Sequence, residues 1–215
     1  MESALRKTAP INLEIIETLR FNPEEGFLRL PAHIDRLEKT CSELLYPFDR
    51  GAILMALGEA VDSEQSRVRL TINIDGKIDV KIGRINNIER WNIGISDKVL
   101  SSIDPWLRVK TTNRIVYDTE RANLKDLDEL LFLNENEEVC EGTITNVFVL
   151  VNGSYLTPPL SSGCLPGVLR QEMLLNGKTK EQVLFLDDLI SADKIFVPSG
   201  LDPLIDHITS LGLQF

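Results

Sequence analysis

Residues 106–114 of this 215-residue chain contain a side chain capable of covalent chemistry. Lys110 stands at the end of a short apolar stretch and just before an expected helix, so a tertiary fold could hold its amine away from water. A desolvated lysine loses its charge readily and then acts as a Schiff-base nucleophile. A solvated lysine flanked by helix-capping threonines has the same local sequence, so both interpretations stay open at this point.

Two later segments offer a carboxylate and a place for an anion. Glu141 and small polar residues open an apolar strand in the run 141–148, a pattern that fits a site glutamate and equally an edge-strand glutamate beside a turn. Residues 163–170 form a Gly-containing loop that enters a helix, and the unpaired amides at such a junction suit a phosphate. Most helices begin without a ligand, so an ordinary loop-to-helix junction is the alternative for this segment.

The composition argues against several classes of partner. The chain carries 33 acidic and 23 basic side chains, a formal net charge of −10, whereas a nucleic-acid binder or a polybasic membrane anchor needs a basic surface. Its longest apolar runs, such as 147–151, have the length of a strand and fall short of the ~20 residues that span a bilayer. Residues 1–10 contain no apolar signal core, and the three cysteines form no CxxC. We therefore expect a cytoplasmic protein without nucleic-acid or membrane partners.

The usual catalytic motifs are missing from the sequence. His33 and His207 are the only histidines, and neither lies in an HExxH or in a Cys/His cluster with zinc spacing, so no metal site is expected. There is no GxSxG nucleophile elbow, no phosphate-binding GxxxxGK loop and no GxGxxG. If this chain is an enzyme, we expect a cofactor to carry its chemistry.

Periodicity and turn residues predict two α/β-type domains of unequal size. The first covers residues 1–87, with strands expected at 11–20, 27–30, 67–74 and 77–83 and helices at 31–46 and 50–61. The polar run 86–90 is the expected boundary. The second covers residues 88–215 and is richer in strands, expected at 92–97, 130–134, 145–151, 154–157, 182–186 and 194–198, with helices at 113–124 and 167–175.

The three chemical segments occur together and in order, and as a set they resemble the class IV, or branched-chain-type, pyridoxal-phosphate enzymes. That family includes branched-chain and D-amino-acid aminotransferases and 4-amino-4-deoxychorismate lyase. The run 31–37 resembles the family's His-x-x-Arg-Leu helix, and the similarity extends from about residue 13 to 200. It implies an α/β (α+β) fold of the two-domain fold-type IV kind and a homodimer. The residues that fit the family's longest pattern are Glu141, Thr143, Asn146, Val147, Phe148, Thr157, Leu165, Gly167 and Arg170.

The resemblance implies a role for individual residues. Lys110 would form the Schiff base with pyridoxal 5′-phosphate, and Glu141 would face the pyridine nitrogen and keep it protonated, which makes the cofactor an electron sink. Arg36 would bind the cofactor phosphate through its planar guanidinium fork. Further residues expected at the site are Val168 and Leu169 through their amides at the phosphate, Asn146, Ser199 and Gly200 at the cofactor, Arg114 at the substrate, and Thr18 in catalytic proton transfer.

The lysine segment resembles the lyase-type members most. Lys110-Thr-Thr-Asn-Arg114 is followed by Tyr117, whereas branched-chain aminotransferases usually carry a tyrosine five residues after the lysine, where this chain has Ile115. The implied reaction on a small amino substrate converts 4-amino-4-deoxychorismate into 4-aminobenzoate and pyruvate, a step toward folate. The alternatives are an aminotransferase for a branched-chain or D-amino acid and a non-catalytic relative that binds the cofactor.

Overall fold

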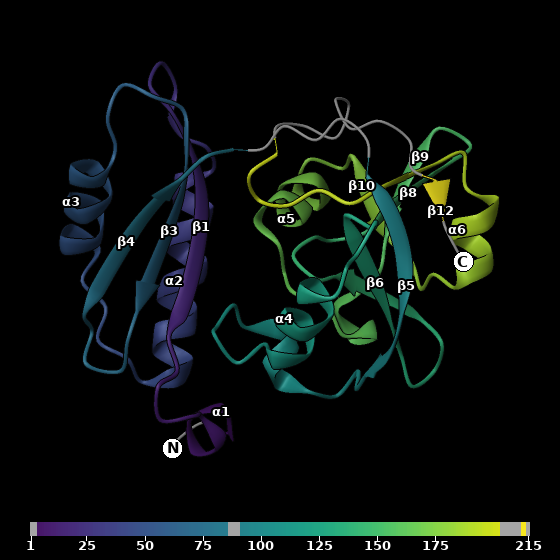
Figure 1. Cartoon of the computed structure of the whole chain (residues 1–215), viewed down its shortest axis with the longest axis horizontal. Helices are drawn as coiled ribbons and strands as arrows, with labels where there is room; N and C mark the ends of the chain where they lie inside the picture. The colour runs from purple at the N-terminus through teal and green to yellow at the C-terminus, as the bar shows by residue number, and fades with distance from the viewer. Residues whose placement is uncertain (1–3, 86–90, 203–211, 214–215) are drawn as a thin grey trace. The chain divides into compact units, whose positions relative to one another are not determined.

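The computed structural model describes residues 4–85, 91–202 and 212–213. Contacts divide the chain into two compact units. The first unit consists of residues 1–86 together with 109–113, and the second of residues 87–108 together with 114–215. Both contain helices and sheets, which confirms the predicted mixed α/β class (Figure 1). Among the described residues, no helix combines the length and the apolarity that crossing a membrane requires.

The first unit is built on a four-stranded antiparallel sheet in the order β2-β1-β3-β4. Helices α2 and α3 pack against it, α2 along β1 and α3 along β4 (Figure 1). The elements are α1 (Ala4–Thr8), β1 (Ile15–Asn22), β2 (Gly26–Phe27), α2 (Leu30–Leu44), α3 (Arg50–Ala60), β3 (Ser66–Ile72) and β4 (Ile78–Gly83).

Strand alternation and helix periodicity build the core of this unit between the sheet and α2. Ile15 pairs with Ile72 and Leu19 with Val68, so these apolar side chains share one face of the sheet. On α2 the buried residues recur every three or four positions, as an amphipathic helix requires. They include Ile34, Leu37, Cys41 and Leu44, all at most 2% exposed. Burying each large aliphatic side chain contributes roughly 1.5–3 kcal/mol.

A short segment from later in the chain joins the edge of β1. The Ile16 amide donates to the Lys110 carbonyl at 2.8 Å, the Thr112 amide donates to the Glu14 carbonyl at 2.9 Å, and Ile15 forms an antiparallel bridge with Thr111. These bonds place residues 109–113 in the first unit. The predicted division at 87/88 put the lysine in the second unit instead, because pairing across such a sequence separation leaves no local pattern. The predicted boundary run 86–90 lies outside the described residues.

The second unit contains two four-stranded sheets, ordered β10-β9-β8-β11 and β12-β5-β6-β7. Its main apolar cluster lies among strands β5, β6 and β8 and helix α6, with Ile93, Leu131, Val149 and Leu189 all buried. The strands are β5 (Asn92–Leu100), β6 (Glu129–Asn134), β7 (Val139–Gly142), β8 (Phe148–Val151), β9 (Ser154–Thr157), β10 (Thr179–Glu181), β11 (Lys194–Phe196) and β12 (Gly212–Leu213). The helices are α4 (Ile115–Ala122), α5 (Val168–Leu175) and α6 (Leu186–Ser191), with short 3₁₀ turns at Pro105–Arg108 and Leu160–Ser162.

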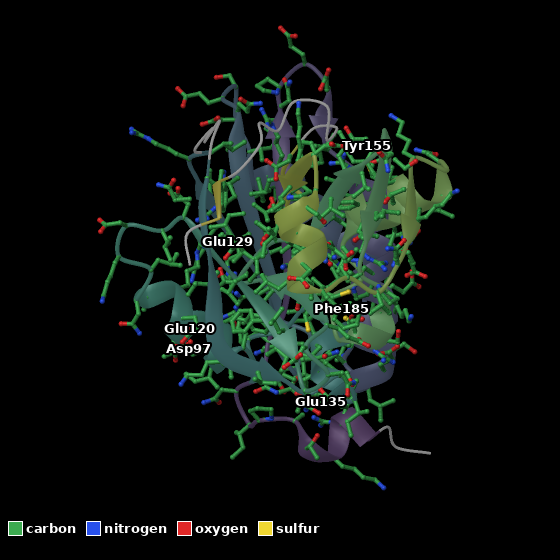
Figure 2. The ribbon with its side chains drawn as sticks, turned by 90° about the vertical axis from the view of Figure 1, so that its right-hand side faces the viewer. Asp97, Glu120, Glu129, Glu135, Tyr155 and Phe185 are labelled. Atoms are coloured by element: carbon green, nitrogen blue, oxygen red, sulfur yellow. The ribbon has the colours of Figure 1, made fainter. Side chains whose placement is uncertain are left out.

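One predicted strand of this unit is wrong. The strand expected at 182–186 is replaced by β10 at 179–181 and by the start of α6 at Leu186. The Asp188 carboxylate accepts a hydrogen bond from the amide of Phe185, which is labelled in Figure 2, and so caps the first turn of α6. The apolar run through Val183 and Leu184 resembles a strand, but the aspartates that follow it favour a helix start.

Candidate active site

Lys110 and Thr18 lie on the same face of the first unit's sheet. Lys110 stands opposite Ile16 in the pairing that extends the edge of β1, and opposite residues share a face. Thr18 is two residues further along β1 and therefore lies on that face too. The register between β1 and β3 places Arg69 directly opposite Thr18. The structure thus brings together a lysine and a threonine that the sequence separates widely, and adds an arginine that the sequence analysis missed.

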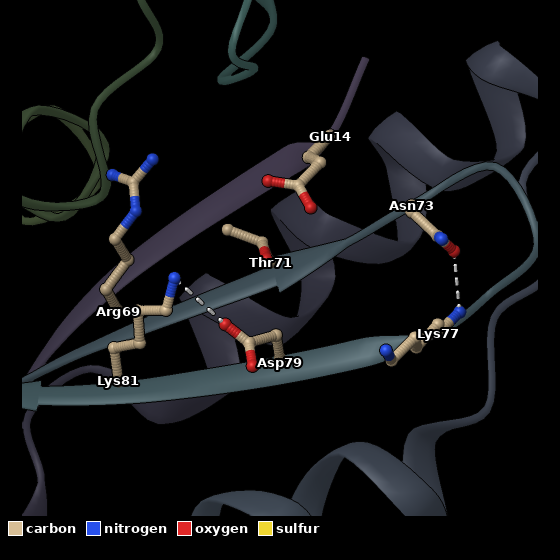
Figure 3. Close-up of a pocket in the computed structure, with 7 residues that line it drawn as sticks. All are labelled: Glu14, Arg69, Thr71, Asn73, Lys77, Asp79 and Lys81. Carbon is tan, nitrogen blue, oxygen red and sulfur yellow. Dashed lines mark hydrogen bonds and ion pairs between the residues drawn. The ribbon is translucent and has the colours of Figure 1, made fainter. Parts of the chain in front are cut away.

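A polar cavity of about 300 Å³ opens on this face (Figure 3). Arg69 and Thr71 of β3 line it beside Asp79 and Lys81 of β4, which form an ion pair at 3.5 Å. Its full lining is Glu14, Arg69, Thr71, Asn73, Lys77, Asp79 and Lys81. Three cations against two carboxylates make the lining positive by one charge, although the whole chain carries −10. The cavity can therefore hold an anionic group that the bulk charge repels.

Glu17 holds Arg36 on the helix-covered face of the sheet. The Arg36 guanidinium donates from Nε to Oε1 at 2.7 Å and from Nη2 to Oε2 at 2.6 Å, and His33 Nδ1 lies 2.6 Å from Oε2. Glu17 is 2% exposed. Burial raises the pKa of this carboxyl, but Arg36 and His33 outweigh it and bring the pKa to about 2. This ion pair orients the Arg36 guanidinium. Binding of the cofactor phosphate by that guanidinium stays a prediction.

In the second unit, the structure joins the second and third chemical segments. Glu141 is the penultimate residue of β7 and is 6% exposed. Its Oε1 accepts a hydrogen bond from the Tyr117 hydroxyl at 2.6 Å, and its Oε2 accepts one from the Leu165 amide at 2.9 Å. A buried carboxylate whose two oxygens are held in this way is suited to accept a hydrogen bond from a protonated nitrogen of a ligand ring.

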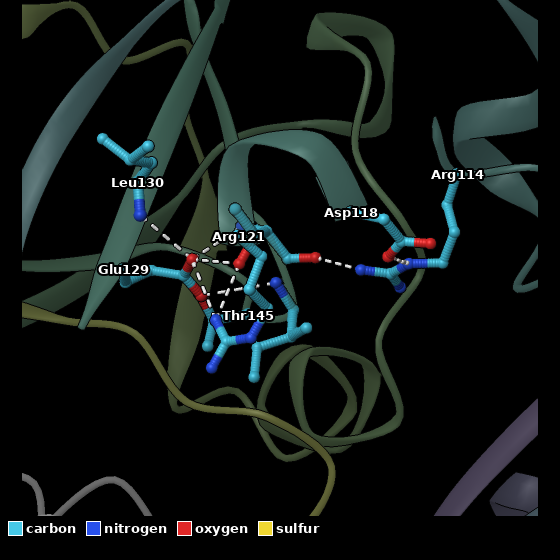
Figure 4. A network of polar contacts seen from close by, with 8 residues as sticks. Arg114, Asp118, Arg121, Glu129, Leu130 and Thr145 are labelled. Atoms are coloured by element: carbon cyan, nitrogen blue, oxygen red, sulfur yellow. Dashed lines mark hydrogen bonds and ion pairs between the residues drawn. The ribbon is translucent and has the colours of Figure 1, made fainter. Parts of the chain in front are cut away.

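Glu129 fixes the turn that follows Glu141 (Figure 4). It is fully buried and accepts hydrogen bonds from the Thr143 amide at 2.9 Å, the Thr143 hydroxyl, and the Thr145 hydroxyl at 2.9 Å. Gly142 is required here, because a Cβ at that position would collide with the Thr145 hydroxyl and the Glu129 carboxylate. Glu129 is not among the predicted site residues, although a glutamate that opens an apolar strand is a signal that the sequence contains.

Asn146 prepares the start of α5. Its Nδ2 donates to the Leu165 carbonyl at 3.0 Å, and a Cβ on Gly167 would collide with its Oδ1. Helix α5 begins at Val168 with no side-chain cap, and Val168 and Leu169 are both buried. An uncapped first turn leaves amides for an anion, so these residues fit a phosphate.

The other predicted site residues make local contacts. Arg114 donates from Nη2 to the Thr143 carbonyl at 2.6 Å and from Nε to Asp118 at 2.7 Å. The Ser199 amide and hydroxyl both bond to Asp202, in the turn that also contains Gly200. Substrate and cofactor contacts of Arg114, Ser199 and Gly200 remain predictions.

The fold and these groups define a class of protein. The first unit has a lysine and a threonine on one sheet face, and the second has a buried carboxylate with fixed donors and an uncapped helix start. Groups of these kinds suit a phosphorylated, ring-containing cofactor. Residues 14–206 match the model of the family described as amino-transferase class IV. The chain belongs to this family of pyridoxal-phosphate-dependent enzymes, and it is an enzyme.

Similar proteins carry two kinds of name. A Schizosaccharomyces pombe protein provisionally named aminodeoxychorismate lyase is 30% identical over 195 residues, covering 85% of this chain and 84% of that protein. A Thermotoga maritima protein provisionally named branched-chain-amino-acid aminotransferase is 25% identical over 199 residues, covering 85% and 72%. The crystal structure of a Mesorhizobium loti protein, provisionally described as an amino-acid aminotransferase, has a TM-score of 0.87 and 35% identity, covering 94% of this chain and 100% of that one. These matches confirm the predicted family and fold.

Proposed function

We propose that this protein is a pyridoxal-phosphate-dependent lyase that converts 4-amino-4-deoxychorismate into 4-aminobenzoate and pyruvate, a step toward folate. The observation that carries the proposal is the placement of Lys110 and Thr18 on one sheet face, because an elimination needs an amine and a hydroxyl close together to move protons. The name of the Schizosaccharomyces pombe relative supports the same reaction.

The residues of this chain have separate tasks in the proposed mechanism. Lys110 would hold the cofactor through Nζ and, once free, would take the proton from the amine-bearing carbon of the substrate. The Thr18 hydroxyl would help deliver a proton to the departing enolpyruvyl group, which leaves as pyruvate. Glu141 would bind the protonated pyridine nitrogen, and Arg36 with the first amides of α5 would bind the phosphate. The bound cofactor supplies an electron sink, and Asn146, Ser199 and Gly200 help to seat it.

The polar cavity supports an anionic substrate. Aminodeoxychorismate carries two carboxylates, and Arg69 and Lys81 line a cavity on the face that bears Lys110 and Thr18. Arginine binds a carboxylate through two parallel hydrogen bonds, which makes Arg69 the group we assign to one substrate carboxylate. Arg114 is a second candidate for substrate contact.

Cofactor binding is tested first, by absorbance and by borohydride trapping. Wild-type protein should take up pyridoxal phosphate with a visible band, and borohydride should fix the cofactor to the chain. Lys110→Ala should abolish the trapped adduct, whereas Lys39→Ala, an exposed lysine on α2 of the same unit, should leave it intact. Wild-type protein that stays colourless and takes up no cofactor would contradict the proposal.

An aminotransferase is the second candidate, because the Thermotoga maritima and Mesorhizobium loti proteins carry that description. Pyruvate release from aminodeoxychorismate without an amino acceptor supports the lyase. Amino transfer from a branched-chain or D-amino acid that depends on a keto acid supports the aminotransferase. Cofactor uptake without a response to any amino compound would identify a non-catalytic relative.

We also propose a cytoplasmic homodimer. The three cysteines are free and buried, which suits a reduced compartment. Sedimentation of the purified protein tests the dimer, and a monomer at micromolar concentration would contradict it.

A further inference from the structure

The hydroxyl of Tyr117 donates a hydrogen bond to Oε1 of Glu141 at 2.6 Å. We infer that Tyr117 is a positioning residue that holds the Glu141 carboxylate in the orientation needed to receive the cofactor's pyridine nitrogen. The inference rests on the proposed function, because the proposed partner of Glu141 is that nitrogen.

Two donors on different segments fix the two oxygens of Glu141. Tyr117 belongs to α4 and binds Oε1, while the Leu165 amide belongs to the loop before α5 and binds Oε2. Because each oxygen accepts a hydrogen bond from a different segment, the protein orients the carboxylate plane before a ligand arrives. Preorganised acceptors of this kind need no rearrangement on binding.

Packing holds the Tyr117 ring in place. It meets Phe132 edge to face, with ring centroids 5.1 Å apart and planes at 73°. The Arg114 guanidinium lies 5.5 Å from the Tyr117 ring centroid. The ring also packs against a buried cluster that contains Leu100, Leu107 and Cys140. The hydroxyl therefore stands at the end of a ring with little freedom to turn.

Helix α4 as a whole is tied to the segment around Glu141. Arg114 binds the Thr143 carbonyl, Tyr117 binds Glu141, and Arg121 donates from Nη1 to the Thr143 hydroxyl at 2.9 Å. Positions 114, 117 and 121 are spaced by three and four residues and lie on one side of the helix. The Tyr117 contact is thus one of three from that side, and the only one of these three that reaches the carboxylate.

Tyr117 can only donate in this pair. Burial raises the pKa of its hydroxyl, and the charge of Glu141 raises it further, so the hydroxyl keeps its proton throughout the working pH range. The phenol therefore stabilises the ionised carboxylate, which is the form that pairs with a protonated ring nitrogen.

The test is Tyr117→Phe, which keeps the ring and removes the hydroxyl. Fluorescence titration of the apo protein should show cofactor affinity weakened about tenfold, a part of what a hydrogen bond to a charged group contributes. The matched control is Tyr155→Phe in the same unit, whose ring meets Phe196 edge to face with centroids 5.5 Å apart (Tyr155 is labelled in Figure 2). The control should bind the cofactor as wild type does.

A double-mutant cycle separates positioning from general destabilisation. In a Glu141→Gln background, Tyr117→Phe should cost little further affinity, because the carboxylate it orients is gone. Equal losses in both backgrounds, or wild-type affinity in Tyr117→Phe, would overturn the inference. If wild type binds no cofactor, the proposed function fails instead, so the two failures are distinguishable. Thermal unfolding of each apo variant checks whether a loss of cofactor affinity comes from a loss of the folded structure.

Discussion

Glu17 and Arg36 form a bidentate ion pair inside the first unit, with Nε–Oε1 and Nη2–Oε2 distances of 2.7 and 2.6 Å. The pair joins β1 to α2, so it links the strand that carries Thr18 to the helix that carries the proposed phosphate ligand. A buried carboxylate in this setting is a source of stability that depends on pH.

Glu17→Gln should therefore destabilise the protein in a pH-dependent way. The pKa of Glu17 lies at about 2 in the folded protein, below its ordinary value of 4.5, so its contribution is present above about pH 5 and is lost as pH falls toward 2. The loss in unfolding free energy should reach about 3 kcal/mol at pH 7 and shrink in acid. Urea unfolding at pH 7, 5 and 3 measures it. A wild-type-to-variant gap that does not change with pH would contradict this account, and Glu38→Gln, an exposed residue of α2, should change little.

Glu129→Ala should lower the unfolding free energy by about 2–4 kcal/mol, because it orphans the buried Thr143 amide and Thr145 hydroxyl. Urea unfolding gives the size of the loss, and hydrogen exchange at the Thr143 amide shows where it occurs. In the variant, the Thr143 amide should exchange faster than global unfolding of the unit would allow. Glu59→Ala, at an exposed position of α3, is the control, and an unaltered Thr143 amide would refute the role of Glu129 in this turn.

Arg69→Ala should raise KM for the amino substrate about tenfold and lower kcat much less. A charged pair with a carboxylate contributes to binding in the ground state as well as the transition state, so its loss mainly weakens binding. Arg67→Ala is the control, since Arg67 lies on the same strand and face but outside the lining of the cavity. A fall in kcat at unchanged KM would contradict the assignment of Arg69 to binding a substrate carboxylate.

Gly167→Ala should destabilise the second unit by about 1–3 kcal/mol and weaken cofactor binding. The new Cβ would displace the Asn146 side chain, which positions the loop before α5. Gly58→Ala on α3 is the contrasting variant, because a Cβ there meets nothing within 4 Å and alanine favours a helix. Thermal unfolding and cofactor titration of both variants provide the measurement. Equal stability of the two would show that the contact at Gly167 relaxes without cost.

Local pattern accounts for the elements that the sequence predicted well. The three- and four-residue spacing of Ile34, Leu37 and Cys41 marks the buried side of α2, and the Asp75-Gly76 turn marks the hairpin of β3 and β4. The apolar run before Leu186 was ambiguous, because strand and helix start differ there only in the capping aspartate. Each of these patterns lies within a few consecutive residues, so the sequence alone is enough to recognise it.

The sequence by itself determined the family, the mixed α/β class and the residues whose chemistry matters, such as Lys110 and Glu141. Only the tertiary structure decided which groups meet them: Lys110 with the edge of β1, and Glu141 with Tyr117 and Leu165. The reason is physical. Periodicity records which side of an element is buried, whereas the register and hydrogen bonds between distant segments depend on how those buried sides pack together.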